Sequence, residues 1–323
     1  MKVFSTRIVP EITRNLLQEN NIQLDEWSDE ELISKEELIH KLSDYDGLFL
    51  MTNKIDREIL EAGKNSLKGI SLLSVGFDNI DVKAATEFGI PASNTPEVLN
   101  EATADIAFLL MQMVARKAIF NYNRILSDNW RVDFTDYLGA DLSGKTLGIF
   151  GLGRIGFVMA QRAKKAFGME VIYHNRSQNP QAEKDLGATY VSFEELVAKS
   201  DVISIHSALT PETKGLFNAE IFSKMKNSAI LINTSRGKVI DEAALYEALL
   251  TGEIWGAGLD VTDPEPMYPE NPLLQMENVA VLPHIGSATV DTRNAMGKLA
   301  AENMLLALKG EKMKTPINPE VYG

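Results

Sequence analysis

Short strand-like hydrophobic runs alternate with longer segments of helical period along most of the chain. In the first hundred residues, examples of these runs are 2–9, 46–51 and 70–76. Apolar runs of this length suit strands buried on both faces, and such strands lie in parallel sheets covered by helices. The pattern therefore predicts an α/β fold built on parallel sheets.

A long helical pattern covers Glu101 to Leu126, and the alternation resumes at Lys145 after a polar segment. Short runs joined by helical crossovers are typical of a doubly wound sheet, and the sequence predicts six strands in this part. These six runs are 146–153, 170–175, 201–207, 229–235, 256–261 and 278–283.

The same patterns predict two domains. A chain of 323 residues exceeds the length of one average domain. The last helical pattern begins near Ser287 and stops near Gly310, a glycine suited to a helix end. If this helix returns to the first lobe, that lobe is discontinuous. We expect one domain to contain residues 1–100 and 288–323, and the other to contain residues 101–287.

Composition narrows the possible functions. A hydrophobic fraction of 45% and a charged fraction of 24% are those of a globular protein. A net charge of −13 argues against nucleic acid or an anionic membrane as a partner. No apolar run reaches the roughly 18 residues of a membrane span. The absence of cysteine fits a cytoplasmic location, and four scattered histidines predict no metal site.

A glycine motif follows the run at 146–150. Gly151, Gly153 and Gly156 stand between this strand-like run and a helical pattern. A strand, a glycine turn and a helix in this order allow backbone N–H groups to bind a pyrophosphate at the positive end of the helix. The motif is weak by itself, but in this setting it predicts a dinucleotide site.

The end of the next strand bears on the choice of cofactor. An acidic residue that binds the adenosine ribose of NAD is expected there, about 20 residues after the glycines. The chain instead has Asn175, Arg176 and Ser177. An arginine and a hydroxyl can bind a 2′-phosphate, which predicts NADP as the preferred cofactor with NAD possible. Alternatively, Arg176 stacks on adenine or points to solvent.

Three residues from separate loops have the chemistry for reducing a 2-keto acid. Arg236 can bind a carboxylate through its planar fork of donors, and His284 can exchange a proton near neutral pH. Glu265 can hold the imidazole, with Asp263 as the alternative carboxylate in the same segment. His206 is expected to be structural or to lie at the edge of the cofactor site.

Seven segments in a fixed order link these residues to a known family. They are SVGFDNID (74–81), NTPEVLNEATADIAF (94–108), DLSGKTLGIFGLGRIG (141–156), HSALTPETKG (206–215), NTSRGKVIDE (233–242), GLDVTDPEP (258–266) and LPHIGSAT (282–289). Over nearly its full length the chain resembles the D-isomer-specific 2-hydroxyacid dehydrogenases, and most of all their glyoxylate/hydroxypyruvate reductase branch. The resemblance implies a Rossmann-type dinucleotide-binding domain, 101–287, inserted into a flavodoxin-like substrate domain.

The resemblance also implies roles for individual residues. Arg236 would bind the carboxylate and keto oxygen of the substrate, His284 would be the general acid and Glu265 its partner. The backbone amides of Val75 and Gly76 would bind the substrate carboxylate. The residues implied for the cofactor site are Thr103, Gly151, Leu152, Gly153, Arg154, Ile155, Gly156, Asn175, Arg176, Ser177, Ala208, Leu209, Thr213, Thr234, Ser235, Arg236, Asp260, His284 and Gly286.

The function that follows is reduction of glyoxylate, hydroxypyruvate or a similar small 2-keto acid to the D-2-hydroxy acid with NADPH. Two alternatives stay open. One is a cofactor-sensing binding protein similar to the dehydrogenase-like transcriptional corepressors, and the other is a reductase for 2-ketogluconate or another 2-keto acid. The family further implies a homodimer that makes contact through the helix from Glu101 and the segment after it.

Overall fold

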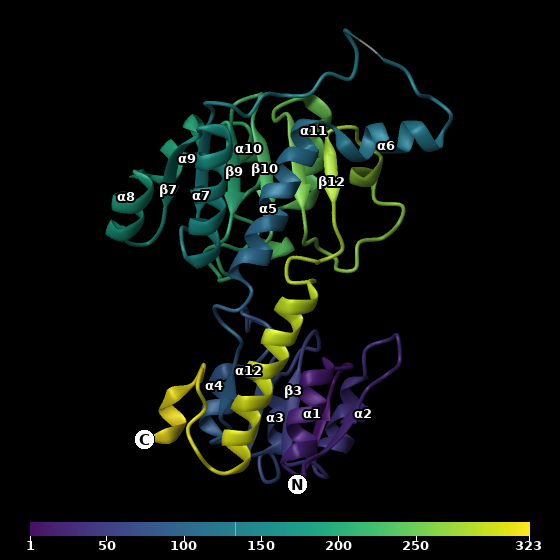
Figure 1. Cartoon of the computed structure of the whole chain (residues 1–323), viewed down its shortest axis with the longest axis vertical. Helices are drawn as coiled ribbons and strands as arrows, with labels where there is room; N and C mark the ends of the chain where they lie inside the picture. Colours follow the sequence, from purple (N-terminus) through teal and green to yellow (C-terminus); the bar gives the residue numbers. More distant parts are fainter. Residues whose placement is uncertain (133) are drawn as a thin grey trace. The chain divides into compact units, whose positions relative to one another are not determined.

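The computed structural model describes residues 1–132 and 134–323. The chain forms two compact units, each built on one parallel sheet (Figure 1). Unit 1 consists of Met1–Leu99 and Ser287–Gly323, and unit 2 of Asn100–Gly286. These boundaries lie one residue before those expected from the sequence, after 99 and 286 instead of after 100 and 287.

Unit 1 contains a five-stranded parallel sheet in the order β2-β1-β3-β4-β5. This order is that of the flavodoxin-like fold, which confirms the predicted fold class. The apolar runs named above do not include β2, which is largely polar, or β5, which has two residues. The strands are β1 (Lys2–Ser5), β2 (Gln23–Glu26), β3 (Gly47–Leu50), β4 (Gly69–Leu72) and β5 (Ala92–Ser93).

Helices cover both faces of this sheet. One cluster of buried side chains joins α2, α3 and α4 to the strands, and a second joins α1 and α12 to the other face. Because α12 packs on α1, β3 and β4, the end of the chain belongs to unit 1. The helices are α1 (Glu11–Glu19), α2 (Lys35–Leu42), α3 (Arg57–Gly63), α4 (Val82–Glu87), α12 (Val290–Leu308) and the 3₁₀ helix η3 (Pro319–Tyr322).

Unit 2 contains a seven-stranded parallel sheet in the order β12-β11-β10-β9-β6-β7-β8. This is the Rossmann order extended by one strand, and it reverses between β6 and β9. The prediction of six strands was wrong because β8 is too short to show as an apolar run. The strands are β6 (Thr146–Phe150), β7 (Glu170–His174), β8 (Thr189–Tyr190), β9 (Val202–Ile205), β10 (Ile230–Asn233), β11 (Gly256–Leu259) and β12 (Val279–Val281).

Alternate residues of these strands enter two different cores. On β10, Ile230 and Ile232 face the cluster that contains α5, α7 and α8, whereas Leu231 faces the cluster that contains α9, α10 and α11. Burial on both faces explains why the strands are apolar runs without alternation. The helices are α5 (Asn100–Ala115), α6 (Ala118–Leu126), α7 (Arg154–Phe167), α8 (Pro180–Leu186), α9 (Phe193–Lys199), α10 (Ala219–Phe222), α11 (Glu242–Thr251), η1 (Gly237–Val239) and η2 (Pro272–Gln275).

The single helix predicted from Glu101 to Leu126 is two helices. Lys117 breaks it with a left-handed backbone conformation, φ 49°. Its amine lies 2.5 Å from an Oε1 of Glu277 and over the ring of Trp255. These contacts stabilise the backbone conformation of Lys117 that ends the first helix. The sequence does not show this interruption, because apolar residues continue at helical spacing on both sides of Lys117. Across the described residues, no helix is long and apolar enough to cross a membrane.

Candidate active site

Arg236, Glu265 and His284 follow three neighbouring strands of unit 2, β10, β11 and β12. Because parallel strands have their carboxyl ends at the same edge of a sheet, these loops lie together. The imidazole Nδ1 of His284 is 2.5 Å from Oε1 of Glu265. Glu265, and not Asp263, therefore contacts the imidazole ring. The other ring nitrogen, Nε2, can exchange a proton with a bound substrate.

The charge of Glu265 is maintained by its surroundings. Burial acts to raise the pKa of Glu265, but the hydrogen bond and charge of His284 and the charge of Arg236 outweigh it. The pKa therefore lies below its usual value, and the carboxylate stays ionised near neutral pH. The His284 side chain is 50% exposed, so a small molecule can reach it.

The loop that carries Arg236 is held by Asn233, the buried last residue of β10. The carboxamide of Asn233 donates to the carbonyl of Arg236 at 2.9 Å and accepts from the N–H of Ser235 at 3.0 Å. A Cβ at Gly237 would lie 2.0 Å from the carbonyl oxygen of Thr262, so this loop meets the loop after β11 closely. The Arg236 guanidinium is thus brought towards Glu265.

Asp260, at the end of β11, organises the backbone after His284. Asp260 is 1% exposed, and its carboxylate accepts from the N–H groups of Ile285 and Gly286, each at 2.8 Å. Burial raises the pKa of Asp260 although these N–H groups oppose the shift. A Cβ at Gly286 would lie 3.0 Å from Asp260 and 3.3 Å from Thr103. Thr103 and Asp260 therefore pack against this loop.

The three glycines after β6 have different surroundings. Gly151 has a φ of 96°, and a Cβ there would lie 2.7 Å from the N of Ser207. A Cβ at Gly156 would lie 2.8 Å from the Gly151 carbonyl oxygen. At Gly153 a Cβ would meet nothing within 4 Å, and α7 begins there without a side-chain cap. Open space at the N-terminus of a helix suits a pyrophosphate.

The end of β7 is tied to the glycine loop. The Asn175 carboxamide accepts from the N–H of Leu152 at 2.6 Å and donates to its carbonyl at 3.3 Å. Asn179 donates to the same carbonyl at 3.1 Å. The side chain of Asn175 therefore holds the loop, while Arg176 and Ser177 are exposed. Asn179 was not among the site residues predicted from the sequence, although an asparagine before a proline marks a helix start.

Two buried hydroxyls fit an additional bound group. Oγ1 of Thr234, after β10, and Oγ of Ser207, after β9, have no hydrogen-bond partner among the residues described. Buried polar atoms are normally satisfied, so orphaned donors at the carboxyl ends of these strands suit a nicotinamide dinucleotide. The loop after β9 is itself ordered, since Oγ1 of Thr213 donates to the carbonyl of Ala208 at 2.8 Å. Leu209 packs on the core beside it.

His206 follows β9 beneath the glycine loop. Burial lowers its pKa to about 4, so the ring is neutral at physiological pH. Its Nε2 lies 2.8 Å from Oγ of Ser204, and a Cβ at Gly156 would lie 3.4 Å from the ring. In the described part of the chain, no group of three or more His, Asp or Glu residues could hold a metal ion.

Unit 1 carries Val75 and Gly76 in the loop after β4. The carbonyl of Val75 accepts from Nδ2 of Asn94 at 2.7 Å, and that of Gly76 accepts from Oγ of Ser74 at 2.7 Å. Both carbonyls are thus held by side chains of unit 1. The sequence did not point to Asn94 as the partner of the Val75 carbonyl.

Comparisons with known proteins agree with this arrangement. The family model described as D-isomer specific 2-hydroxyacid dehydrogenase, NAD binding domain, matches residues 108–286. A glyoxylate reductase of Korarchaeum cryptofilum is 44% identical over 99% of this chain and 96% of its own length.

Solved structures extend the similarity to the fold of the whole chain. A glyoxylate reductase from Paecilomyes thermophila has a TM-score of 0.88 and 36% identity over 98% of both chains. An NADPH-dependent glyoxylate/hydroxypyruvate reductase from Sinorhizobium meliloti, in complex with NADP and malonate, has a TM-score of 0.85. It is 32% identical, and the match covers 99% of this chain and 97% of that one. The chain therefore belongs to the D-isomer specific 2-hydroxyacid dehydrogenase family and is an NAD(P)-dependent dehydrogenase.

Proposed function

We propose that this protein reduces glyoxylate, hydroxypyruvate or a similarly small 2-keto acid to the D-2-hydroxy acid, with NADPH as the preferred reductant. The observation that carries the proposal is the 2.5 Å contact between His284 Nδ1 and Glu265, with Arg236 close enough for its charge to lower the pKa of Glu265. The reductase relatives support this choice of substrate class.

The roles follow from the chemistry of each group. The dinucleotide supplies a hydride to the keto carbon when it is bound. Arg236 binds the substrate carboxylate and keto oxygen, which fixes the orientation of the substrate and lowers the entropic part of the barrier. His284 donates a proton from Nε2 to the oxygen as negative charge develops there. Glu265 keeps the ring oriented through Nδ1. The amides of Val75 and Gly76 bind the substrate carboxylate.

The proposed preference for NADPH rests on the end of β7. Asn175 brings no negative charge, and the exposed Arg176 and Ser177 can bind a 2′-phosphate. A hydrogen bond from Thr210 is the main cause of the lowered pKa of Glu212, and the charge of Arg176 contributes to it, so this charge acts on the loop after β9. The 2′-phosphate of NADPH would take the place of Glu212 as the negative charge that interacts with Arg176.

Steady-state kinetics with both cofactors test the preference. We expect Arg176→Ala to raise the KM for NADPH about tenfold or more, because a charge-assisted contact is lost, while the KM for NADH changes little. Lys165→Ala removes an exposed positive charge from the end of α7 and is the matched control. Equal loss for both cofactors, or no loss, would contradict the role of Arg176.

The substrate class is tested by a panel of 2-keto acids at fixed NADPH. We expect the highest kcat/KM with glyoxylate or hydroxypyruvate, and 2-ketogluconate is the alternative that the panel must contain. The corepressor alternative is not favoured, because relatives named as reductases match over nearly the full length of the chain. Absence of nicotinamide oxidation with every acid would contradict the proposed function.

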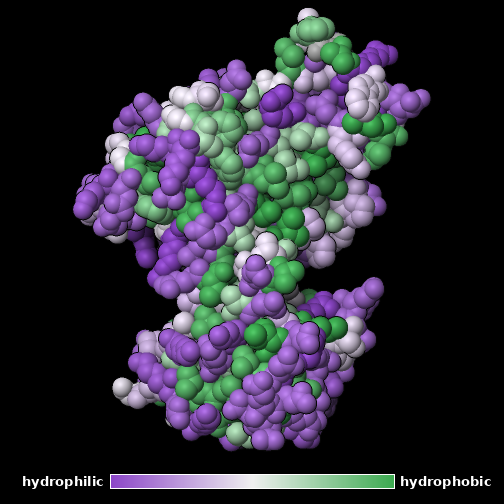
Figure 2. All heavy atoms as spheres, viewed as in Figure 1, coloured by the Kyte–Doolittle hydropathy of each residue, from purple (hydrophilic) through white to green (hydrophobic). Residues whose placement is uncertain are grey.

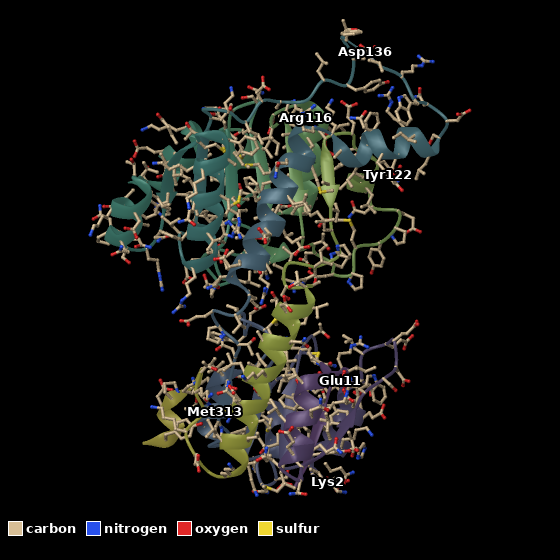
Figure 3. The ribbon with its side chains drawn as sticks, viewed as in Figure 1. Lys2, Glu11, Arg116, Tyr122, Asp136 and Met313 are labelled. Atoms are coloured by element: carbon tan, nitrogen blue, oxygen red, sulfur yellow. The ribbon has the colours of Figure 1, made fainter. Side chains whose placement is uncertain are left out.

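We also propose a homodimer whose contact includes α6 and the segment after it. No side chain of α6 is buried in the chain itself, and Leu126 and Trp130 are 69% and 77% exposed. Hydrophobic atoms lie at the surface around this segment, interspersed with hydrophilic ones (Figure 2). Tyr122 of α6 and Asp136 lie at the periphery of unit 2 (Figure 3). Exposed apolar residues in one segment are typical of an interface.

A further inference from the structure

We propose that the C-terminal tail of the chain, residues 313–318, positions the loop of Val75 and Gly76 through Thr315 and Asn94. These two residues are positioning residues for the binding of the substrate carboxylate. The inference deepens the proposed function and rests on it, because that function assigns the carboxylate to this loop. All of the contacts involved lie within unit 1.

The tail continues the sheet of unit 1 beyond β5. It begins at Met313, beside α12 (Figure 3). Pro316 pairs with Ser93 in an antiparallel bridge, and the N–H of Ile317 donates to the carbonyl of Ala92 at 2.8 Å. The buried Asn318 accepts from the N–H of Ala92 at 2.8 Å. The tail is therefore attached to the edge strand by the backbone of Ile317 and by the side chain of Asn318.

Thr315 lies where this tail meets α12 and the end of β5. Its Oγ1 donates to the carbonyl of Asn94 at 2.6 Å and accepts from Nδ2 of Asn303 at 2.8 Å. Its N–H donates to Oδ1 of Asn303 at 3.2 Å. Asn303 is fully buried on α12. A buried amide with both of its polar atoms bonded to one residue fixes that residue firmly.

Asn94 connects this junction to the loop. Its Nδ2 donates to the carbonyl of Val75 at 2.7 Å, and the N–H of its neighbour Thr95 donates to the carbonyl of Ser74 at 2.8 Å. The peptide unit between Val75 and Gly76 is planar. Fixing the Val75 carbonyl therefore fixes the direction of the Gly76 N–H, which is one of the donors proposed to bind the carboxylate.

Thr315→Val tests the chain of contacts, because valine keeps the shape and removes the hydroxyl that bonds Asn94 and Asn303. We expect the KM for glyoxylate to rise about tenfold, the scale of one or two lost hydrogen bonds, with kcat and the Kd for NADPH changed less than about twofold. Hydrogen exchange of the backbone amides in residues 73–80 should become faster. Thr315→Ser should restore both values.

Two further variants separate positioning from general loss of stability. Thr13→Val removes a buried hydroxyl of unit 1 that has no partner among the described residues, and should change neither readout. Asn94→Ser keeps the backbone contacts and withdraws the amide from Val75. It should reproduce the effect of Thr315→Val, and it serves in its place if that variant does not fold.

The outcomes distinguish this inference from the proposed function. Unchanged exchange in 73–80, or an unchanged KM for glyoxylate in folded Thr315→Val and Asn94→Ser, would overturn the inference. Failure of serine at 315 to restore the KM would also count against it. If the wild-type protein fails to oxidise NADPH with any of the 2-keto acids tested, the proposed function is contradicted instead. Hydrogen exchange would still decide whether the tail fixes the loop.

Discussion

Glu265 and Asp263 lie two residues apart in the sequence, and their different contacts show which of them is the partner of His284. Glu265 reaches Nδ1 of His284, whereas the N–H of Asp263 donates to Glu242 at 3.2 Å. His284 has a φ of 52°, an uncommon conformation for a residue other than glycine. Such backbone is found where the surrounding structure requires it, and in this case it turns the ring towards Glu265.

His206 should make the protein lose stability in acid. Burial lowers the pKa of His206 from 6.5 to about 4, so between these values the unfolded chain binds more protons than the folded one. Stability therefore falls as pH falls through this range, by about 3 kcal/mol for a shift of this size. Urea unfolding of wild type and His206→Asn at pH 7 and pH 4 measures this contribution.

In His206→Asn the difference in unfolding free energy between the two pH values should be smaller by about 3 kcal/mol, because no ring is left to protonate. The unfolding free energy of the variant at pH 7 serves as its reference. Loss of the contact with Ser204 lowers that value at both pH values, and it does not change the difference between them. An identical pH dependence in both proteins would show that the His206 ring does not control acid stability.

At the scale of elements, the strand, glycine turn and helix from Thr146 to Phe167 should respond differently at two of its glycines. Gly156→Ala should destabilise the fold by about 1–3 kcal/mol, because its Cβ meets the Gly151 carbonyl. Gly153→Ala has room for its Cβ, so it should fold normally. It should nevertheless weaken NADPH binding at least tenfold, since the methyl group occupies space for the pyrophosphate.

Thermal unfolding and NADPH titration of the two variants check this pair of expectations. Each variant is the matched control for the other, because both substitutions add one methyl group to the same turn. Normal NADPH binding by Gly153→Ala, or a stability loss equal to that of Gly156→Ala, would mean that the open space at Gly153 is not the cofactor site.

Much of the element pattern could be predicted because the central strands are buried on both faces and read as apolar runs. Short edge strands such as β5 and β8 could not, since two residues leave no periodic signal. The break at Lys117 depends on Glu277 and Trp255, which are distant in sequence. The contact of Asn94 with Val75 was missed for the same reason.

At the scale of the whole molecule, the exposed segment after α6 predicts self-association. Sedimentation velocity should give wild type a mass about twice that of the 35.7 kDa chain. Trp130→Glu should weaken the dimer at least tenfold, because a charge replaces an exposed aromatic anchor. Leu250→Glu changes an exposed apolar residue on α11 and is the control. A monomeric wild type would contradict the proposed contact.

In the proposed function, the loops after β10, β11 and β12 form a keto acid reductase site in which His284 supplies the proton. The most direct measurement is NADPH oxidation with glyoxylate by wild type and His284→Ala, with the Kd for NADPH determined for both. We predict a turnover lower by roughly 10²-fold or more in the variant, the usual scale of general acid catalysis, with NADPH binding retained. Full turnover by His284→Ala would contradict the role of His284 as the general acid.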